Sequence, residues 1–109
     1  MSQNRERIRA LNDELRQHLL AGSAVITPGI AALGPQAVNR LVQTIAVFDD
    51  FSTANDPYGE HDFGVFDFDG NRVMFKIDYY SKDLKSHSTN PADPSVTERI
   101  ITLMLAGEY

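Results

Sequence analysis

The chain has 109 residues, and 42% of them are hydrophobic, which is enough to build the core of one domain. It contains no cysteine, so disulfides, thiolate nucleophiles and sulfur-bound zinc are excluded. A formal net charge of -5 argues against direct binding of nucleic acid, because proteins that bind nucleic acid usually present a basic face.

The first residues lack the apolar run of a signal peptide, and no segment is apolar over the length of a membrane span. We therefore expect one cytoplasmic domain over residues 1–109, without membrane contact. No glycine-rich phosphate loop or other motif indicates a bound cofactor, so none is expected.

Two helices and a strand are expected in the first half of the chain. Residues 2–20 predict an amphipathic helix, because apolar side chains recur three or four positions apart at Ile8, Leu11, Leu15 and Leu19. The β-branched run at residues 23–27 predicts a short strand, which the Pro-Gly pair at residues 28–29 ends in a turn. A second amphipathic helix is expected over about residues 34–48, with proline near its first position.

A β-hairpin is the clearest local signal of the sequence. Two strand-like runs, residues 60–68 and 71–80, are separated by Asp-Gly at residues 69–70, a pair that favours a two-residue hairpin turn. If Phe68 pairs with Asn71, the apolar side chains gather on one face, whereas a slip by one residue would mix the two faces. That face then carries Phe66, Phe68, Val73, Phe75 and Ile77.

The end of the chain is expected to form a third helix over about residues 93–106. Ile101 and Leu105 make this helix apolar almost all round, which predicts a place in the core or contact with a second subunit in a homodimer. The expected fold class is therefore α+β, in the order α-β-α-β-β-α. A small antiparallel sheet, formed by the hairpin at residues 60–80 and the strand near residues 23–27, is covered by three helices.

The second face of the hairpin carries a possible catalytic cluster. In the expected register His61 lies across from Asp78, with Cβ atoms about 4.5–5.5 Å apart. Lys76 and Tyr80 flank this pair on the same face, so general acid–base chemistry is conceivable. The alternative interpretation is a cross-strand ion pair that stabilises the hairpin and has no catalytic role.

A metal site is a sharper version of the same hypothesis. His61 and Asp78 would need a third ligand, either Asp56 from the preceding loop or His87 from the loop after the hairpin. No spacing in the chain matches a known metal-binding motif. The two residues therefore remain candidates for a metal site only by their residue types.

Acidic residues dominate the middle of the chain. Between Arg40 and Arg72 there is no Lys or Arg, although seven Asp and Glu residues occur there. The resulting negative field favours a protein partner with a basic surface. The residues expected to bind that partner are Asp49, Asp50, Asp56, Tyr58, Glu60 and Asp62.

A row of carboxylates could also imitate nucleic acid. Glu60 with Asp62, and Asp67 with Asp69, are two positions apart, which on an extended strand places them roughly 6.6 Å apart on one face. This spacing is close to that of phosphates along a nucleic-acid strand. The alternative is a solvated acidic loop that keeps a small protein soluble.

Several segments resemble a bacterial family of unknown function. The strings Asn55–Gly64, Lys76–Tyr80 and Thr27–Ile30 carry this resemblance, which extends over nearly the whole chain. It implies a short, single-domain protein that is frequent in alphaproteobacteria and often encoded near plasmid or integrative-element genes. No activity is assigned to that family, so the resemblance implies no catalytic residue.

Three functional hypotheses follow from these observations. The leading one is a non-enzymatic interaction module that binds a protein. It uses the acidic loop, predicted over residues 49–59, and the outer hairpin face, which is the face of His61, Lys76, Asp78 and Tyr80. The second is a small enzyme or metal-binding protein that works through His61 and Asp78, with Lys76 or Tyr80 in support. The third is an acidic nucleic-acid mimic that inhibits a basic DNA-binding partner.

Overall fold

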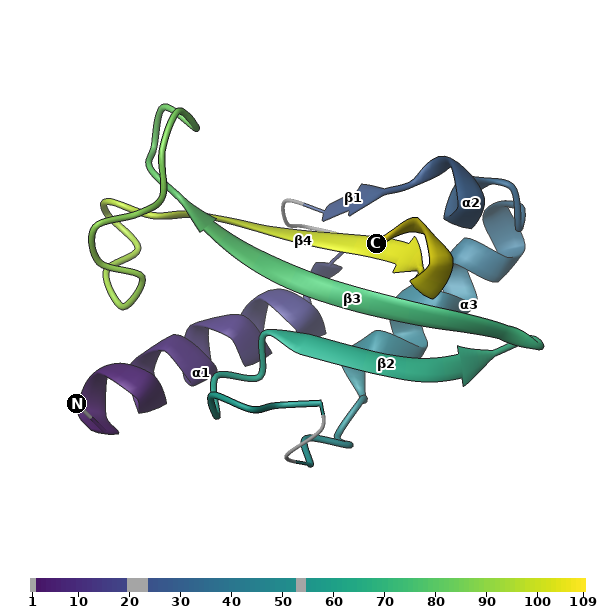
Figure 1. Ribbon diagram of the computed structural model, residues 1–109, viewed down its shortest axis with the longest axis horizontal. Helices are drawn as coiled ribbons and strands as arrows, with labels where there is room; N and C mark the ends of the chain where they lie inside the picture. The colour runs from purple at the N-terminus through teal and green to yellow at the C-terminus, as the bar shows by residue number, and fades with distance from the viewer. Residues whose placement is uncertain (1, 20–23, 53–54) are drawn as a thin grey trace.

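The computed structural model describes residues 2–19, 24–52 and 55–109. This part of the chain forms three α-helices and one four-stranded sheet, so the predicted α+β class is confirmed (Figure 1). Its elements are α1 (Ser2–Gln17), β1 (Ala24–Ile26), α2 (Pro28–Ala31), α3 (Pro35–Ala46), β2 (Phe63–Phe68), β3 (Asn71–Tyr80), β4 (Glu98–Leu105) and a final 3₁₀ turn, η2 (Ala106–Glu108).

The sheet has the strand order β1-β4-β3-β2 and is covered by helices on one face (Figure 1). Strands β2, β3 and β4 are antiparallel neighbours, whereas β1 runs parallel to β4, so the sheet is mixed and not wholly antiparallel as expected. The core lies between this face and the helices. It is built from Ile30, Ala37, Leu41 and Ile45 of the helices and from Phe68, Val73, Phe75, Ile77, Ile101 and Leu103 of the strands.

The predicted register of the hairpin is confirmed, because Phe68 pairs with Asn71 and the ladder continues to Phe63 and Lys76. The predicted strand at residues 60–68 is three residues too long, since β2 begins only at Phe63. His61 has a φ of 57°, a left-handed conformation that ends the extended backbone. The predicted face is confirmed for Val73, Phe75 and Ile77, which are almost fully buried.

The helix predicted over residues 93–106 is wrong, because this segment contains the strand β4. Strand β4 lies between β1 and β3 in the sheet, and Ile101 and Leu103 are fully buried. Ile101 and Leu103 face the core, and Ile100 and Met104 on the other face of β4 are apolar as well, so the strand carries an apolar run that resembles a helix apolar all round. The real order is therefore α-β-α-α-β-β-β. The helix from which a second subunit was expected does not exist in the structure.

The remaining elements follow the sequence closely. The first helix, the first strand and the second helix are found where they were expected, as α1, β1 and α3. The predicted end of the first helix at residue 20 and the first residue of the predicted strand lie outside the described residues. The predicted turn at residues 28–29 is instead the start of α2, a single helical turn whose Ile30 is fully buried.

A cluster of aromatic rings fixes the chain that leaves α3. The ring of Phe48 lies 5.1 Å from that of Phe51, 5.3 Å from Phe66 and 5.4 Å from Phe75, measured between centroids. Gly64 makes room for this packing, because a Cβ there would lie 2.5 Å from Phe75 Cε2 and 2.8 Å from Phe48 Cε1. The acidic loop after α3 therefore starts from a firmly packed position.

Candidate functional site

A buried polar network holds α1 against the sheet. Asn12 is fully buried, and its side-chain amide donates to the backbone oxygen of Glu60 at 3.0 Å and to the hydroxyl of Tyr79 at 2.8 Å. Its Oδ1 accepts from Arg99 Nε at 2.9 Å, and the hydroxyl of Tyr79 donates to Glu60 Oε1 at 2.8 Å. One side chain thus joins α1, the acidic loop, β3 and β4.

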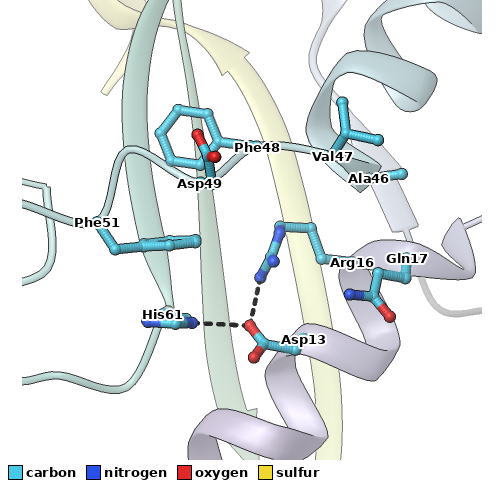
Figure 2. Close-up of a pocket in the computed structure, with 9 residues that line it drawn as sticks. All are labelled: Asp13, Arg16, Gln17, Ala46, Val47, Phe48, Asp49, Phe51 and His61. Carbon is cyan, nitrogen blue, oxygen red and sulfur yellow. Dashed lines mark hydrogen bonds and ion pairs between the residues drawn. The ribbon is translucent and has the colours of Figure 1, made fainter.

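An open cavity of about 480 Å³ lies next to this network, where α1 meets the end of α3 and the acidic loop (Figure 2). Asp13 Oδ1 lies 2.8 Å from both His61 Nδ1 and Arg16 NH1. The imidazole of His61 stacks on the ring of Phe51 at a centroid distance of 3.8 Å. The guanidinium of Arg16 lies 4.8 Å from the centroid of that same Phe51 ring.

His61 is held from its other side by Asp56. The backbone N–H of His61 donates to Asp56 Oδ1 at 3.0 Å, and the ring Nε2 lies 3.5 Å from Asp56 Oδ2. Both ring nitrogens therefore face carboxylates of the same chain. We call this arrangement of Asn12, Asp13, Arg16, Asp56 and His61 the helix–loop junction.

The predicted pair of His61 and Asp78 is wrong. Asp78 accepts from Lys76 Nζ at 2.7 Å on its own strand, while His61 lies outside β2 and contacts Asp13. Tyr80 stacks on His87 and does not join His61. The pairing fails because the backbone leaves the extended conformation at His61.

A metal site at these residues finds no support in the geometry. Within residues 2–19, 24–52 and 55–109, no group of three or more His, Asp or Glu side chains could hold a metal ion.

In the same ranges, no helix is long and apolar enough to cross a membrane.

The polar side chains that α1 contributes to the junction were not predicted from the sequence. Asn12 and Arg16 are buried, with 0% and 4% of their surfaces exposed, yet they stand between apolar residues of an amphipathic helix. Their spacing carries a signal, since Ile8, Asn12 and Arg16 are four residues apart and share one helical face. Polar residues on the apolar stripe of a helix indicate buried hydrogen bonds.

Most of the acidic residues have partners within the chain. Asp69 pairs with Arg40 at 2.7 Å and Asp67 with Arg72 at 3.1 Å, while Asp50 accepts from Asn55. The row of carboxylates expected for a nucleic-acid mimic is not formed. Glu60 and Asp62 precede β2, and Asp69 lies in the turn with a φ of 51°.

A second hollow lies where the acidic loop reaches the outer hairpin face. This cleft has a volume of about 220 Å³ and is lined by Pro57, Tyr58, Asp62 and Phe63. Tyr58 is 70% exposed, and Phe63, the first residue of β2, alternates with the buried Gly64 and so lies on the helix-free face of the sheet. The cleft thus combines two aromatic rings, one proline and one carboxylate.

Asp62 differs from its acidic neighbours in having no side-chain donor. Glu60, Asp56 and Asp78 accept from Tyr79, His61 and Lys76, respectively. In the described part of the chain, Asp62 forms no ion pair, and its backbone oxygen accepts from Ile77 N at 2.8 Å. Burial, and then the charges of Glu60, Asp56 and Asp78, raise the pKa of the Asp62 carboxyl, although its own backbone N–H opposes the shift.

Comparison with known proteins gives one match. A family model described as "Protein of unknown function (DUF3768)" matches residues 26–108. These residues include the acidic loop, the whole sheet except the first two residues of β1, and both hollows except for the side chains from α1. No curated protein and no solved structure matches the chain.

Proposed function

The chain belongs to the DUF3768 family, and we propose that it is a non-enzymatic interaction module that binds a protein partner with a basic surface. The contact surface is the place where the acidic loop meets the outer hairpin face. Of the residues expected from the sequence to bind this partner, Tyr58 and Asp62 line the cleft there.

The observation that carries this proposal is an exposed aromatic ring beside an unpaired carboxylate. Tyr58 presents 70% of its surface to solvent, and such exposed tyrosines are frequent anchors of protein interfaces. Three further carboxylates, those of Glu60, Asp56 and Asp78, act on Asp62 electrostatically. This field attracts a basic partner and speeds its encounter.

The helix–loop junction supports a structural role for His61 over a catalytic one. A general base must offer a free ring nitrogen to its substrate. In His61, Nδ1 lies 2.8 Å from Asp13, and Nε2 faces Asp56 at 3.5 Å. His61 is thus flanked on both sides by carboxylates of its own chain, which supports a structural role.

The resemblance to a mobile-element-associated family supports a narrower version of the proposal. We infer that the protein acts in the cytoplasm, as an accessory protein of a plasmid or integrative element. In this proposal the partner is a different protein; the homodimer stays a prediction, although the helix that suggested it is the strand β4.

Site-specific photo-crosslinking in the organism that encodes the protein tests the proposal. A benzophenone amino acid replaces Tyr58, and in a control it replaces Leu84, which is 53% exposed on the connection between β3 and β4. We expect one protein to be crosslinked from position 58 and not from position 84. Equal crosslinking from both positions, or none from position 58, would overturn the proposal.

A further inference from the structure

We propose that the cleft formed by Pro57, Tyr58, Asp62 and Phe63 binds the side chain of one lysine of the partner. This inference rests on the proposed function and adds the chemistry that is recognised. The aromatic walls contact the four-carbon stem of the lysine, and the Asp62 carboxylate accepts from its ammonium group.

The size of the cleft fits one side chain. Its volume of about 220 Å³ lies below the roughly 300–1,000 Å³ of typical pockets for small molecules. The lining is mostly apolar, since Pro57, Tyr58 and Phe63 form three of its four residues. A ligand with an apolar stem and one polar end matches such walls, and lysine has this composition.

The negative charge of the cleft favours a cationic ligand. Asp62 lines the wall, and in the described residues no Lys, Arg or His pairs with it. Its neighbours Glu60 and Asp56 add negative charge that favours a bound ammonium group, whereas the charge of Asp78 is offset by Lys76 at 2.7 Å. The face of the exposed Tyr58 ring adds an attraction for cations that a neutral ligand would not experience.

The larger cavity at the helix–loop junction is also lined by an acid without an internal partner among the described residues, Asp49, but that side chain is exposed to solvent. The cavity already contains a cation, the guanidinium of Arg16, which is bound to Asp13 and lies over Phe51. Only 4% of Arg16 is exposed. The smaller cleft is the better cation site of the two, because its half-buried carboxylate has no cation of the described chain beside it.

Lysine is favoured over arginine by the small volume of the cleft, about 220 Å³. A guanidinium is a rigid planar fork that gains most when two of its N–H groups meet a carboxylate in parallel. An ammonium group is more compact, so it needs less room to reach the one carboxylate that lines the cleft. The preference between the two side chains is open to direct measurement.

The test is an NMR titration of the ¹⁵N-labelled protein with N-acetyl-lysine methylamide. The norleucine analogue, which has a similar apolar stem and no charge, and the arginine analogue serve as comparison probes. Asp62→Asn and Tyr58→Ala are the site variants. Asp67→Asn is the matched control, because this acid lies on the same hairpin with 78% of its side chain exposed.

We expect saturable shifts of the amides of residues 57–63 with a millimolar Kd, which is typical of so small a ligand. Binding should weaken at least fivefold in Asp62→Asn and in Tyr58→Ala, and should stay unchanged in Asp67→Asn. Equal shifts with the norleucine probe, tighter binding of the arginine probe, or no shifts at residues 57–63 would overturn the assignment to lysine.

Failure of this inference is distinguishable from failure of the proposed function. If the lysine probe does not bind but a partner is still crosslinked from position 58, the partner uses another group and the interaction module stands. If position 58 yields no crosslinked partner, the proposed function is wrong whatever the probe does.

Discussion

Two hollows of the molecule, the cavity at the helix–loop junction and the cleft beside Tyr58, contain similar side chains and differ in how their partly buried carboxylates are paired. At the helix–loop junction, Asp13 has contacts with His61 and Arg16 at 2.8 Å, and Asp56 holds the other side of His61. In the cleft, Asp62 lies beside Tyr58 and Phe63 with no basic partner among the described residues. An internally paired carboxylate stabilises the fold, whereas an unpaired one is available to a ligand.

The largest loss of stability is expected from Asn12→Ala. This change removes three hydrogen bonds and leaves Arg99 Nε and the backbone oxygen of Glu60 without the partner that Asn12 supplies. We expect a loss of about 3 kcal/mol in the free energy of unfolding, because each unsatisfied buried group costs about 1–3 kcal/mol. Urea unfolding followed by circular dichroism measures it, and Asn39→Ala, on the exposed face of α3, is the matched control.

A smaller loss is expected from Asp13→Asn. The amide keeps the shape of the side chain but removes the negative charge that faces His61 and the buried Arg16. We expect a loss of about 2 kcal/mol, since an uncompensated buried charge is costly. Glu14→Gln, one residue further along α1 and exposed, should change the stability by less than about 0.5 kcal/mol. Equal effects of the two changes would contradict the role given to Asp13.

Asp62→Asn is expected to leave the fold intact or to stabilise it slightly. The pKa of Asp62 is raised in the folded state, so between the ordinary and the raised pKa the folded protein binds more protons than the unfolded one. Its ionisation therefore lowers stability as the pH rises through this window, and the neutral amide removes that cost. A thermal unfolding scan at pH 7 should show no decrease of Tm, and a clear decrease would mean that Asp62 has an internal partner.

The affinity of the cleft for the lysine probe should decrease on acidification. Protonation removes the charge of Asp62, and its pKa is raised by burial and by Glu60, Asp56 and Asp78. The decrease should therefore begin at a higher pH than for an ordinary aspartate, whose pKa is about 3.9. Titrations of the wild-type protein at several pH values between 7 and 4 measure this, with the norleucine probe as the pH-independent control. An affinity for the lysine probe that is constant over this range would show that Asp62 is not the acceptor.

The smallest effect on stability is expected from Tyr58→Ala. The ring is 70% exposed, and substitutions at exposed positions usually change stability by less than about 0.5 kcal/mol. Its effect should appear in the binding of the lysine probe and of the partner. A large loss of stability would place Tyr58 among the structural residues and weaken the comparison between the two hollows.

The sequence was sufficient for the parts of the fold that local signals specify. The Asp-Gly pair defined the hairpin turn and the register of Phe68 with Asn71, and periodicity located α1 and α3. It was insufficient for β4, because this strand also carries apolar residues on its helix-free face and so shows little alternation of polar and apolar residues. The β-branched residues Ile100, Ile101 and Thr102 were the remaining signal that favoured a strand.

The sequence indicated residues of the candidate site, but not the contacts between them. The acidic loop and the outer hairpin face were both expected to bind a partner, and Tyr58 and Asp62 were named among the residues that do so. The pair of His61 and Asp78 was wrongly predicted, because the strand was extended through His61, which adopts a left-handed φ. The true partner of His61, Asp13, is 48 residues away in sequence, and no local pattern reports such a contact.

The most direct test of the central claim is one map of amide shifts in the wild-type protein at saturation with the lysine probe. We expect the shifts to concentrate at residues 57–63, and the amides of Asp13, Arg16 and Phe51 to remain unchanged. Shifts centred on these three residues would place the binding site at the helix–loop junction. That result would contradict the claim that the paired carboxylates of Asp13 and Asp56 stabilise the fold, whereas the unpaired carboxylate of Asp62 binds the lysine.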